Sequence, residues 1–481
     1  MKASRQQVIT ALTNLLGEDR IVTDLDLLRE HDSDDGAYAK AFGIYRVPLP
    51  MCIVNVLSKE EVSEVLKYCN NNGIAVIPRT GASAYEGLLS ATTEDTIVLD
   101  ASGMNKILKI DDINMMATCQ CGVPLKTLED LLNKKGFTTG HGPQSLPLAQ
   151  MGGLVATRSI GQFSTYYGGI EDLICGLEAV LPDGEIIRIR NVPRRSAGPD
   201  LRHLIVGSEG GTAFITEVTV KIFRYYPESF WRGGYIVPSM KEGFETIRKI
   251  IAAGYRPSVV RLYDKADYDY NYGTVELKDS EAYMFFVAEG PPSIAKATGE
   301  AIEKFTQEAN CRYIGTKHVD YWLIHKNDLC NKFRSQAIRD KFREDHLYYA
   351  TTEISGSWTD IVDIYYSTIA AIKEKVDNLV FVGGHASHAY QNGINIYFVY
   401  TIEISDPNVA AEEHQRVVDI ICEETLRKET GGCVHHHGMG KMRVKFAPQE
   451  HGSSYVLMKR LKKMMDPNNI MNPGVLVGKD N

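Results

Sequence analysis

Glycine-rich loops are the first parts of this chain whose residue types and spacing could do chemistry. The stretch 141–176 holds two glycine pairs, Gly152-Gly153 and Gly168-Gly169, and hydroxyl groups from Thr157 and Ser159 lie between them in sequence. Because glycine has no Cβ, its backbone can approach a ligand closely and adopt positive φ without steric strain. Such a surface suits a large, flat, anionic ligand, and the alternative is an ordinary glycine-rich surface loop.

Two further loops favour the ligand-binding interpretation. The segment Gly73–Pro78 has the pattern of a buried strand and runs into the small-residue loop Arg79–Leu88, whose backbone N–H groups could face a diphosphate. A third glycine- and serine-rich loop, Pro193–Glu217, precedes another strand. The chain therefore contains, in order, three loops that could bind an anionic ligand through their backbone. It has no Walker A sequence and no GxGxxG motif at the start of a helix.

Two histidine clusters are the other candidates for residues that take part in chemistry. The run His435–His437 is followed by glycine, and a second cluster contains His385 and His388. For an isolated histidine run the structural alternative is a polar turn. A divalent metal site built from His385, His388 and His436 is chemically possible. We expect no metal, because carboxylates that would orient the imidazoles are not evident nearby in the sequence; His385 and His388 are expected to line a substrate pocket or to pack.

Composition limits the class of protein. The 481 residues favour two or three domains, and the 44% hydrophobic and 24% charged residues are those of an ordinary soluble globular protein. A net charge of −8 without a Lys/Arg run argues against nucleic acid as a partner. No apolar stretch is long enough to span a bilayer, and the N-terminus lacks the apolar core of a signal peptide. The nine scattered cysteines indicate reduced, mostly packing thiols of a cytoplasmic protein.

The elements that must position these residues follow from local patterns. Ser4 and Gln7 form a capping-box pattern at the start of an N-terminal helix, and Ser58 caps a second helix. We expect the segment Asp24–Pro50 to be irregular. Pro182-Asp-Gly184 predicts a hairpin turn between two strands. These elements form a first α+β domain over residues 1–225, with its core at about 46–225.

The pattern changes at Tyr225-Tyr-Pro227. Repeating strand–helix–strand units over residues 226–428 predict a second domain, an antiparallel sheet with helices on one face. The last segment, residues 429–481, carries the histidine run, a helix and the stop Asp466–Pro473.

The three loops, in this order, resemble the FAD-binding domain of the vanillyl-alcohol oxidase / p-cresol methylhydroxylase (PCMH) flavoprotein superfamily. The matching markers are the loop after Pro78, the block Gly152-Gly153 to Asp172, the segment Gly207-Ser-Glu-Gly210, and Asp466–Gly474. The resemblance covers nearly the whole chain. It implies an α+β fold: a PCMH-type, two-subdomain FAD-binding domain, a cap domain whose antiparallel sheet is covered by helices, and a C-terminal segment that returns to the FAD domain and the active site.

Within that superfamily the second half resembles the alkyl-dihydroxyacetone-phosphate synthase branch. The matches are at Ser258–Leu262, Ala337–Asp340, Glu353–Trp358, Asn395–Phe398 and Val434–Lys441. The resemblance implies that Tyr397 is the acid/base beside flavin N5. It implies as well that the histidine run tunes the Tyr397 proton, and that Arg261 and Arg339 hold an anionic group. The chemistry is sensible by itself, because a phenol flanked by imidazoles can accept a proton when hydride leaves a C–H bond, and guanidinium matches two oxygens of a carboxylate or phosphate.

The resemblance assigns residues to three roles. The catalytic set is Tyr397, His435, His436, His437 and Arg339. The substrate-binding set is Arg261, Arg339, His385, His388 and Tyr390. The cofactor-binding set is Pro78, Arg79, Thr80, Gly81, Ala82, Ser83, Ala84, Gly87, Leu88, Pro143, Gln144, Ser145, Met151, Gly152, Gly153, Ala156, Thr157, Ser159, Tyr166, Gly168, Gly169, Glu209, Gly210 and Ile215. We expect noncovalent FAD, because the first loop holds no His or Cys that could attach the flavin.

The leading functional hypothesis is an FAD-dependent dehydrogenase or oxidase that transfers hydride from a C–H next to oxygen of a small or medium-sized anionic hydroxy-type substrate to flavin N5. One alternative is an alkyl-dihydroxyacetone-phosphate synthase, which exchanges acyl for alkoxy on flavin N5 without net redox change. The other is an electron-transferring flavoprotein subunit of a complex. An electron-transfer partner therefore stays open, and a homodimer is expected.

Overall fold

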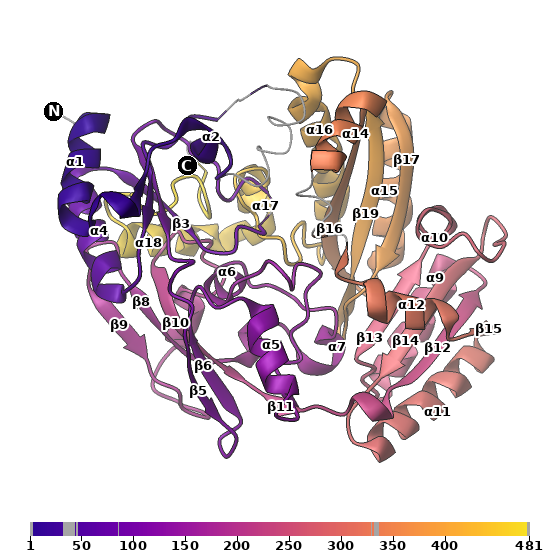
Figure 1. Cartoon of the computed structure of the whole chain (residues 1–481). Coiled ribbons are helices and arrows are strands. Elements are labelled where there is room, and N and C mark those ends of the chain that lie inside the picture. Colours follow the sequence, from indigo (N-terminus) through magenta and orange to yellow (C-terminus); the bar gives the residue numbers. More distant parts are fainter. Residues whose placement is uncertain are drawn as a thin grey trace.

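The computed structural model describes residues 3–31, 44, 47–84, 86–328, 330 and 336–478, without the side chains of residues 336–339 and 342. The chain forms two halves that lie side by side (Figure 1). The N-terminal half contains two sheets and a two-stranded ribbon, and the other half contains one large sheet. Within the part described, no helix combines the length and the apolar character needed to cross a membrane.

The N-terminal helix α1 (Arg5–Leu16) begins as its sequence predicts. The Ser4 hydroxyl accepts a hydrogen bond from the Gln7 backbone N–H at 3.3 Å, and the Gln7 side chain accepts one from the Ser4 N–H at 2.8 Å. The segment expected to be irregular after residue 24 instead starts with a short helix, α2 (Leu25–Arg29). The Asp24 carboxylate accepts the N–H groups of its first turn, and sequence reasoning missed this cap.

The first sheet has the order β1-β2-β4-β3, with β2 and β3 parallel to β4. The helix α4 (Lys59–Asn72), capped by Ser58, connects β2 to β3. The bounds of the strands are β1 (Ile21–Val22), β2 (Ile53–Asn55), β3 (Ala75–Arg79) and β4 (Thr96–Asp100).

The second sheet is antiparallel, with the order β5-β6-β10-β8-β9. Its β8–β9 hairpin turns at Pro182-Asp-Gly184, as predicted, and Gly184 has φ +87°. The other elements of this half include a β7–β11 ribbon. The bounds are β5 (Ile107–Asp111), β6 (Met116–Gln120), α5 (Leu125–Asn133), β7 (Phe137–Thr138), α6 (Met151–Ala156), α7 (Ser164–Tyr167), α8 (Ile170–Leu173), β8 (Ile174–Val180), β9 (Ile186–Ile189), β10 (Phe214–Lys221) and β11 (Phe223–Arg224), with 3₁₀ turns η1 (Glu18–Arg20) and η2 (Leu201–Leu204).

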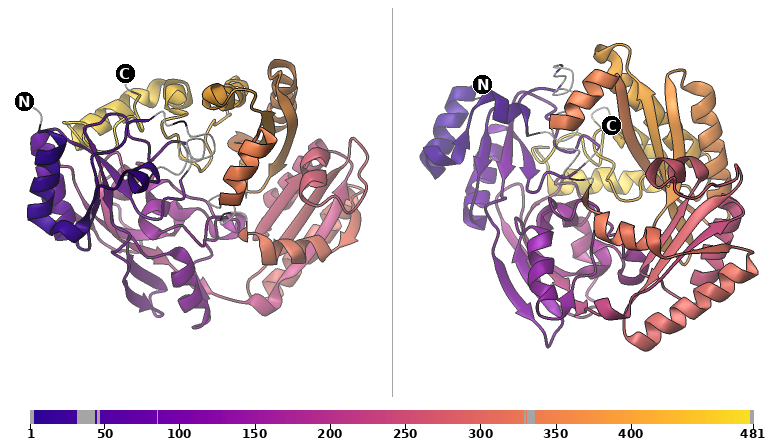
Figure 2. Two further views of the ribbon diagram at one scale, coloured as in Figure 1. Left: turned by 45° about the horizontal axis from the view of Figure 1, so that its top comes forward. Right: turned by 45° about the vertical axis from the view of Figure 1, so that its right-hand side comes forward.

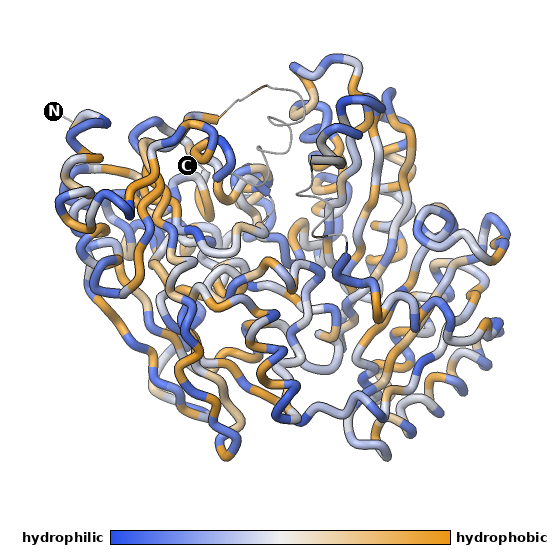
Figure 3. The backbone as a smooth tube through the Cα atoms, viewed as in Figure 1, coloured by the Kyte–Doolittle hydropathy of each residue, from blue (hydrophilic) through white to orange (hydrophobic). Residues whose placement is uncertain are grey.

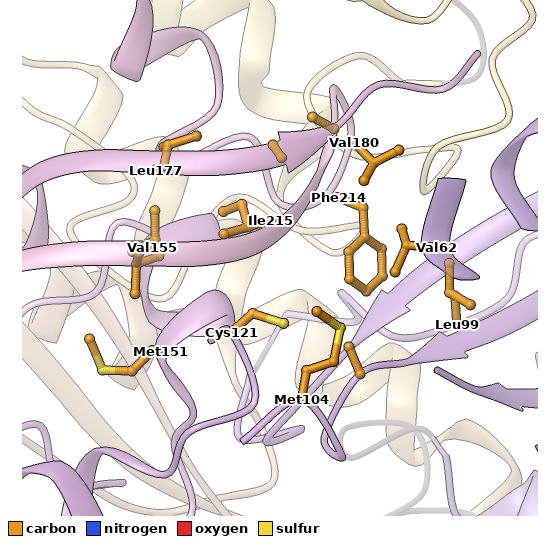
Figure 4. Close-up of a cluster of buried hydrophobic side chains, with 14 of the residues drawn as sticks. Val62, Leu99, Met104, Cys121, Met151, Val155, Leu177, Val180, Phe214 and Ile215 are labelled. Atoms are coloured by element: carbon orange, nitrogen blue, oxygen red, sulfur yellow. The ribbon is translucent and has the colours of Figure 1, made fainter. Parts of the chain in front are cut away.

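One apolar core joins the two sheets of this half. Figure 4 shows side chains from α4, β4, α6, β8 and β10 around a common centre, with Phe214 between the two sheets. The core also contains Ile470 and Met471 from the far end of the chain. Burial of these apolar side chains fixes the loops between the strands in place.

The large sheet is antiparallel in all its strand pairs, with the order β15-β12-β14-β13-β17-β19-β16 and β18 on β19. Its strands are β12 (Trp231–Val237), β13 (Val259–Tyr263), β14 (Ala282–Ala288), β15 (Arg312–Gly315), β16 (Leu347–Ser357), β17 (Leu379–Ala386), β18 (Ala389–Tyr390) and β19 (Gly393–Glu403). Its helices are α9 (Met240–Ala252), α10 (Lys265–Asn271), α11 (Pro292–Glu308), α12 (Lys317–His325), α14 (Gln336–Asp345), α15 (Ile361–Lys375) and α16 (Ala410–Leu426), with 3₁₀ turns η3 (Pro227–Ser229) and η4 (Pro407–Val409).

Helices contact both faces of this sheet, so the prediction of helices on one face is wrong in part. α9, α11, α15 and α16 share an apolar cluster with one face. Tyr268 of α10 and Val319 and Trp322 of α12 pack on the other face, in a smaller aromatic cluster. In Figure 3 hydrophobic stretches run along the strands inside each half, and hydrophilic stretches lie at the outer turns.

The C-terminal segment lies against the N-terminal half (Figure 2). Met471 bridges to Val76 of β3, and the Lys462 ammonium donates to the Gly211 carbonyl at 2.8 Å. The elements of this segment are η5 (Val444–Phe446), α17 (Ala447–His451), η6 (Gly452–Ser454) and α18 (Tyr455–Met465).

Candidate active site

A row of side chains crosses the large sheet on the face that carries α10 and α12. Strand register makes Tyr263 the partner of His385, His385 the partner of Tyr397, and Tyr397 the partner of Glu353. Directly paired residues point to the same face of a sheet. Four strands, β13, β17, β19 and β16, therefore present these four polar side chains side by side.

A cavity of about 900 Å³ lies between this row and the loops of the N-terminal half. Tyr263, His385 and Tyr397 line it from the sheet. The opposite wall is made by the glycine-rich loops after β3, before and within α6, and before β10. The two halves of the chain thus contribute different walls to one site.

Most of the residues predicted to bind the cofactor lie in this lining. All of them line the cavity except Met151, Tyr166, Gly168 and Gly169. Met151 is buried in the apolar core, Tyr166 and Gly168 line a second, smaller cavity, and the Gly169 N–H donates to Asp172 at 3.0 Å. The assignment of these residues to cofactor binding stays a prediction.

The loop wall fits a large polar ligand. The side-chain oxygens of Gln150 and Gln162 and the Nε of Arg79 are buried without a hydrogen-bond partner among the described residues, and all three side chains line the cavity. Buried polar atoms normally have partners, so a ligand that supplies them is expected here. Glycine is required at Gly210, where φ is +73° and a Cβ would lie 2.9 Å from the Pro78 ring.

The segment His435–Gly440, here called the histidine loop, is held by two buried carboxylates. Glu353 accepts the N–H groups of His435, His436 and His437 at 3.2, 3.1 and 2.6 Å. Glu209, from the loop before β10, accepts the N–H groups of Met439 and Gly440. One carboxylate comes from each half of the chain, so the histidine loop ties the two walls together.

The two carboxylates differ in charge compensation. Burial alone would raise the pKa of Glu353, but the Arg443 guanidinium, 3.1 Å away and fully buried, holds it well below its usual range. Arg443 also pairs with Glu86 at 2.6 Å. Burial raises the pKa of Glu209 to about 7, since its N–H donors and the more distant Arg443 charge lower it less.

Tyr397 is connected to the histidine loop. Its hydroxyl lies 2.5 Å from His436 Nε2, and its ring stacks on His385 with the centroids 4.8 Å apart. Removal from water, followed by the neighbouring histidines, lowers the pKa of His436 well below its ordinary value, so this ring is neutral at physiological pH. A neutral imidazole that faces a phenol can accept its proton.

The predicted catalytic histidines occupy different positions. His436 and His437 line the cavity, whereas His435 lies behind them and contacts Tyr390. Tyr390, predicted to bind substrate, lines the second cavity instead of the main one.

The other two histidines are oriented by residues from distant parts of the chain. His385 Nδ1 lies 2.5 Å from Asp267 of α10, and His388 Nδ1 lies 2.8 Å from Ser164 of α7. Both rings line the cavity. Among the residues that the structure describes, no group of three or more His, Cys, Asp and Glu side chains is arranged to hold a metal ion.

Two cations that have no carboxylate partner among the described residues lie at the sheet side of the cavity. Arg261 is 8% exposed, its guanidinium lies 5.1 Å from the Trp322 ring, and its Nε has no partner in the described part of the chain. Lys326, just after α12, also lines the cavity, and burial lowers its pKa. Arg339 lies in α14, but its side chain is outside the described residues.

Sequence reasoning missed the residues that support the site. Asp267, Arg443, Glu86 and Lys326 had no motif of their own, and their partners are far away in sequence. Glu353 stood in a matched segment, but its role as acceptor for the histidine loop had no signal in the sequence. Only the spatial pairing shows it.

Comparisons with known proteins agree with this architecture. Residues 50–190 match the model of an FAD binding domain, and residues 231–476 match that of the C-terminal domain of FAD linked oxidases. The chain is 47% identical over 484 residues to the uncharacterized FAD-linked oxidoreductase YgcU of Escherichia coli strain K12, covering 99% of each chain.

More distant relatives carry two kinds of name. An alkyldihydroxyacetonephosphate synthase of Caenorhabditis elegans is 27% identical, over 89% of this chain and 76% of the relative. The mitochondrial D-lactate dehydrogenase [cytochrome] 1 of Saccharomyces cerevisiae is 26% identical, over 88% of this chain and 72% of the relative.

Solved structures share the fold. An alkyldihydroxyacetonephosphate synthase superposes with a TM-score of 0.77 and 21% identity, over 98% of this chain and 85% of that one. p-Cresol methylhydroxylase with substrate bound gives a TM-score of 0.76 and 14% identity, over 99% and 97%. The predicted α+β, PCMH-type fold is therefore confirmed.

Proposed function

The chain belongs to the FAD-linked oxidoreductases and uses FAD as its cofactor, and on that premise we propose that it is a dehydrogenase or oxidase for a small anionic hydroxy acid. The observation that carries this proposal is the position of Tyr397. Tyr397 lines the cavity on the same sheet face as the buried cation Arg261, and its hydroxyl contacts a neutral imidazole.

Binding of an anion follows from the uncompensated charges. A buried guanidinium without a carboxylate partner is stabilised when a carboxylate or phosphate enters the cavity. Arg261 lies on β13, and Tyr397 lies two strands away on β19, so their strands are about 10 Å apart. Two long side chains at this separation can hold the two ends of one small molecule, with Lys326 as a second cation.

Proton removal is the task proposed for Tyr397. Bound FAD supplies a hydride acceptor for the C–H bond next to the hydroxyl. As that bond breaks, Tyr397 takes the hydroxyl proton, and the His436 imidazole receives the proton of the phenol. His385, fixed by Asp267, stacks on the Tyr397 ring and keeps it in position.

FAD would be held by the loop wall without a covalent bond. The residues proposed to hold it are the cavity-lining members of the predicted set, and none of those in the loop after β3 is His or Cys. Acid precipitation of the yellow protein is expected to leave the flavin in the supernatant. Flavin that remains in the protein pellet would show a covalent bond.

The function is tested by anaerobic mixing of the purified holoenzyme with a panel of 2-hydroxy acids and hydroxylated aromatic acids. We expect at least one acid to bleach the flavin absorbance. Palmitoyl-dihydroxyacetone phosphate is run in parallel, because relatives are named as synthases. Bleaching by that compound alone, reversed by a fatty alcohol, would replace the proposal with the synthase alternative.

The role of Tyr397 is tested by Tyr397→Phe. Loss of the phenol is expected to slow flavin reduction by about 10²–10⁴-fold, the range of general acid–base catalysis, while the flavin stays bound. The measurement is the anaerobic bleaching rate at saturating acid, with flavin content as the control. Bleaching at the wild-type rate would remove Tyr397 from the mechanism.

A further inference from the structure

A chain of hydrogen bonds leads from Tyr397 away from the main cavity. The Tyr397 hydroxyl lies 2.5 Å from His436 Nε2. His436 Nδ1 lies 2.8 Å from His435 Nδ1. His435 Nε2 lies 2.7 Å from the hydroxyl of Tyr390. Two phenols are therefore connected through both nitrogens of two consecutive imidazoles.

The chain ends at a second cavity. This cavity, of about 340 Å³, is lined by α7 and by the turn around β18, including Tyr390. Asp172, Arg256 and Gln391 also line it, and all three are exposed, so it opens toward solvent. Tyr397 and His436 line the main cavity, whereas Tyr390 and His435 do not. The hydrogen bonds thus connect two separate cavities.

Burial keeps the groups of this hydrogen-bond chain neutral. Burial lowers the pKa of His435 to about 4 and the pKa of His436 well below its ordinary value. Burial, more than the nearby Glu171 and Asp172, raises the pKa of Tyr390, so its hydroxyl keeps its proton.

Other groups pack against the histidine rings from the surrounding elements. His388 lies beside both rings of the chain, with its centroid 5.3 Å from that of His435. His437 and Glu353 face the rings from the histidine loop and β16, and Arg443 compensates Glu353. Burial outweighs the Glu353 charge, which raises the pKa of both rings, so His435 and His436 are neutral.

Neutral rings allow only two arrangements of protons. A neutral imidazole has one donor and one acceptor nitrogen, and one nitrogen of the Nδ1–Nδ1 contact must carry the hydrogen. If His436 donates there, Tyr397 donates to His436 and His435 donates to Tyr390. If His435 donates, every bond is reversed. Changing the first arrangement into the second moves one proton from the Tyr397 end to the Tyr390 end.

We infer that these residues form a proton exit, in which Tyr390 delivers the proton of the substrate hydroxyl to solvent in the second cavity. The inference rests on the proposed function. Tyr397 gains the substrate proton and passes its own to His436 Nε2; His436 passes its Nδ1 proton to His435, and His435 passes its Nε2 proton to Tyr390, which releases one to water. One proton enters and one leaves, and no electron moves along the chain. Exchange with water between turnovers restores the first arrangement.

The exit has a clear use in the reaction. A substrate large enough to meet Arg261 and Tyr397 together lies between the Tyr397 hydroxyl and the water of the main cavity. The path through His436, His435 and Tyr390 does not pass the substrate. Tyr390 is therefore a proton-transferring residue in this site, in place of the substrate-binding role predicted for it.

The first test needs no substrate. Nitrogen-15 NMR of the holoenzyme labelled at histidine reports which ring nitrogen carries hydrogen. Tyr390→Phe is expected to shift Nε2 of His435 by several ppm and the nitrogens of His436 by less. Tyr366→Phe, a change of the same kind at an exposed tyrosine of α15, is the matched control and is expected to shift neither. Unchanged histidine signals in Tyr390→Phe would overturn the proton exit.

The second test follows the proton itself. The holoenzyme is mixed anaerobically, in weak buffer with a pH-indicator dye, with the panel acid that bleaches the wild type. Proton release is expected to keep pace with bleaching in the wild type and to slow at least about tenfold in Tyr390→Phe. In Tyr390→Ala, added imidazole can enter the enlarged cavity and is expected to restore release, whereas a purely structural defect would not respond.

The outcomes separate the two proposals. Wild-type proton release in Tyr390→Phe, or no response of Tyr390→Ala to imidazole, overturns the exit and leaves the proposed function intact. Failure of every hydroxy acid to bleach the wild type overturns the proposed function. The NMR experiment then still decides whether the two cavities are connected through the histidines.

Discussion

The two ends of the histidine loop are fixed by the same kind of contact but respond to pH in opposite directions. At the His435 end the acceptor is Glu353, which stays ionised beside Arg443. At the Gly440 end the acceptor is Glu209, whose pKa burial raises to about 7. This difference indicates that backbone donors alone do not keep a buried carboxylate fully charged at neutral pH, whereas a paired guanidinium does.

The direction of each pH effect on stability follows from proton linkage. The folded pKa of Glu353 is depressed, so its contribution to stability is present above its ordinary pKa of 4.5 and is lost as pH falls through the folded value. The folded pKa of Glu209 is raised, so its contribution is present below 4.5 and is lost as pH rises through about 7. Near neutral pH Glu209 titrates, whereas Glu353 stays ionised.

The largest expected effect comes from removing the ionised end. Glu353→Ala leaves three backbone N–H groups and part of the Arg443 charge without their acceptor. We expect a loss of about 3–5 kcal/mol in the free energy of unfolding, measured by urea denaturation at pH 7.5. Glu353→Gln, which keeps an acceptor oxygen, is the matched control and should lose less. Equal stability of Glu353→Ala and the wild type would show that Glu86 alone compensates Arg443.

An intermediate effect is expected at the other end. Glu209→Gln keeps the shape and an acceptor oxygen for Met439 but cannot ionise. The wild type is expected to lose stability between pH 4.5 and about 7, by an amount on the order of 3 kcal/mol, and the variant is expected to lack this slope. The measurement is urea denaturation over a pH series. Parallel curves for the two proteins would mean that Glu209 has an ordinary pKa.

The smallest effect separates backbone strain from contact with Glu209. Gly438 has φ +87°, and a Cβ there would lie 2.6 Å from Glu209 Oε1. Gly438→Ala is expected to cost about 1–2 kcal/mol for the left-handed backbone, plus the displacement of Glu209. Gly73→Ala, at φ +64° with no atom within 4 Å of the added Cβ, measures the backbone part alone. If both variants lose the same stability, the displacement of Glu209 does not change the free energy of unfolding.

Local elements could be predicted from the sequence because their signals are local. Ser4 with Gln7 and Pro182-Asp-Gly184 specify a helix start and a hairpin within a few residues, and both occur in the structure. The short helix after Asp24 was missed because five residues give no periodicity. The helices α10 and α12 on the second sheet face were missed because one sequence does not show which face a short helix covers.

In the candidate site, too, residues within motifs could be predicted and long-range pairs could not. Tyr397 and the histidine run could be named from matched motifs, and the structure brings Tyr397 and His436 into contact. The hydrogen bond from His385 to Asp267 and the ion pair of Arg443 with Glu86 join positions 118 and 357 residues apart. A single sequence carries no local signal for pairs that are this far apart. These buried partners nevertheless decide which groups are charged.

The row Tyr263, His385, Tyr397 and Glu353 has a consequence for how the length of this chain can change. Tyr263, His385 and Tyr397 reach the cavity, and Glu353 reaches the histidine loop, only because each strand is in register with the next. A shift by one residue turns a strand's whole side-chain set to the opposite face. One inserted residue in β17 or β19 would therefore turn His385 or Tyr397 toward the aliphatic side chains behind the sheet and break the row. A change of length in a loop between these strands does not by itself alter this register. We therefore expect new substrates to be accommodated by changes in the loops of this scaffold, while its strand lengths stay constant.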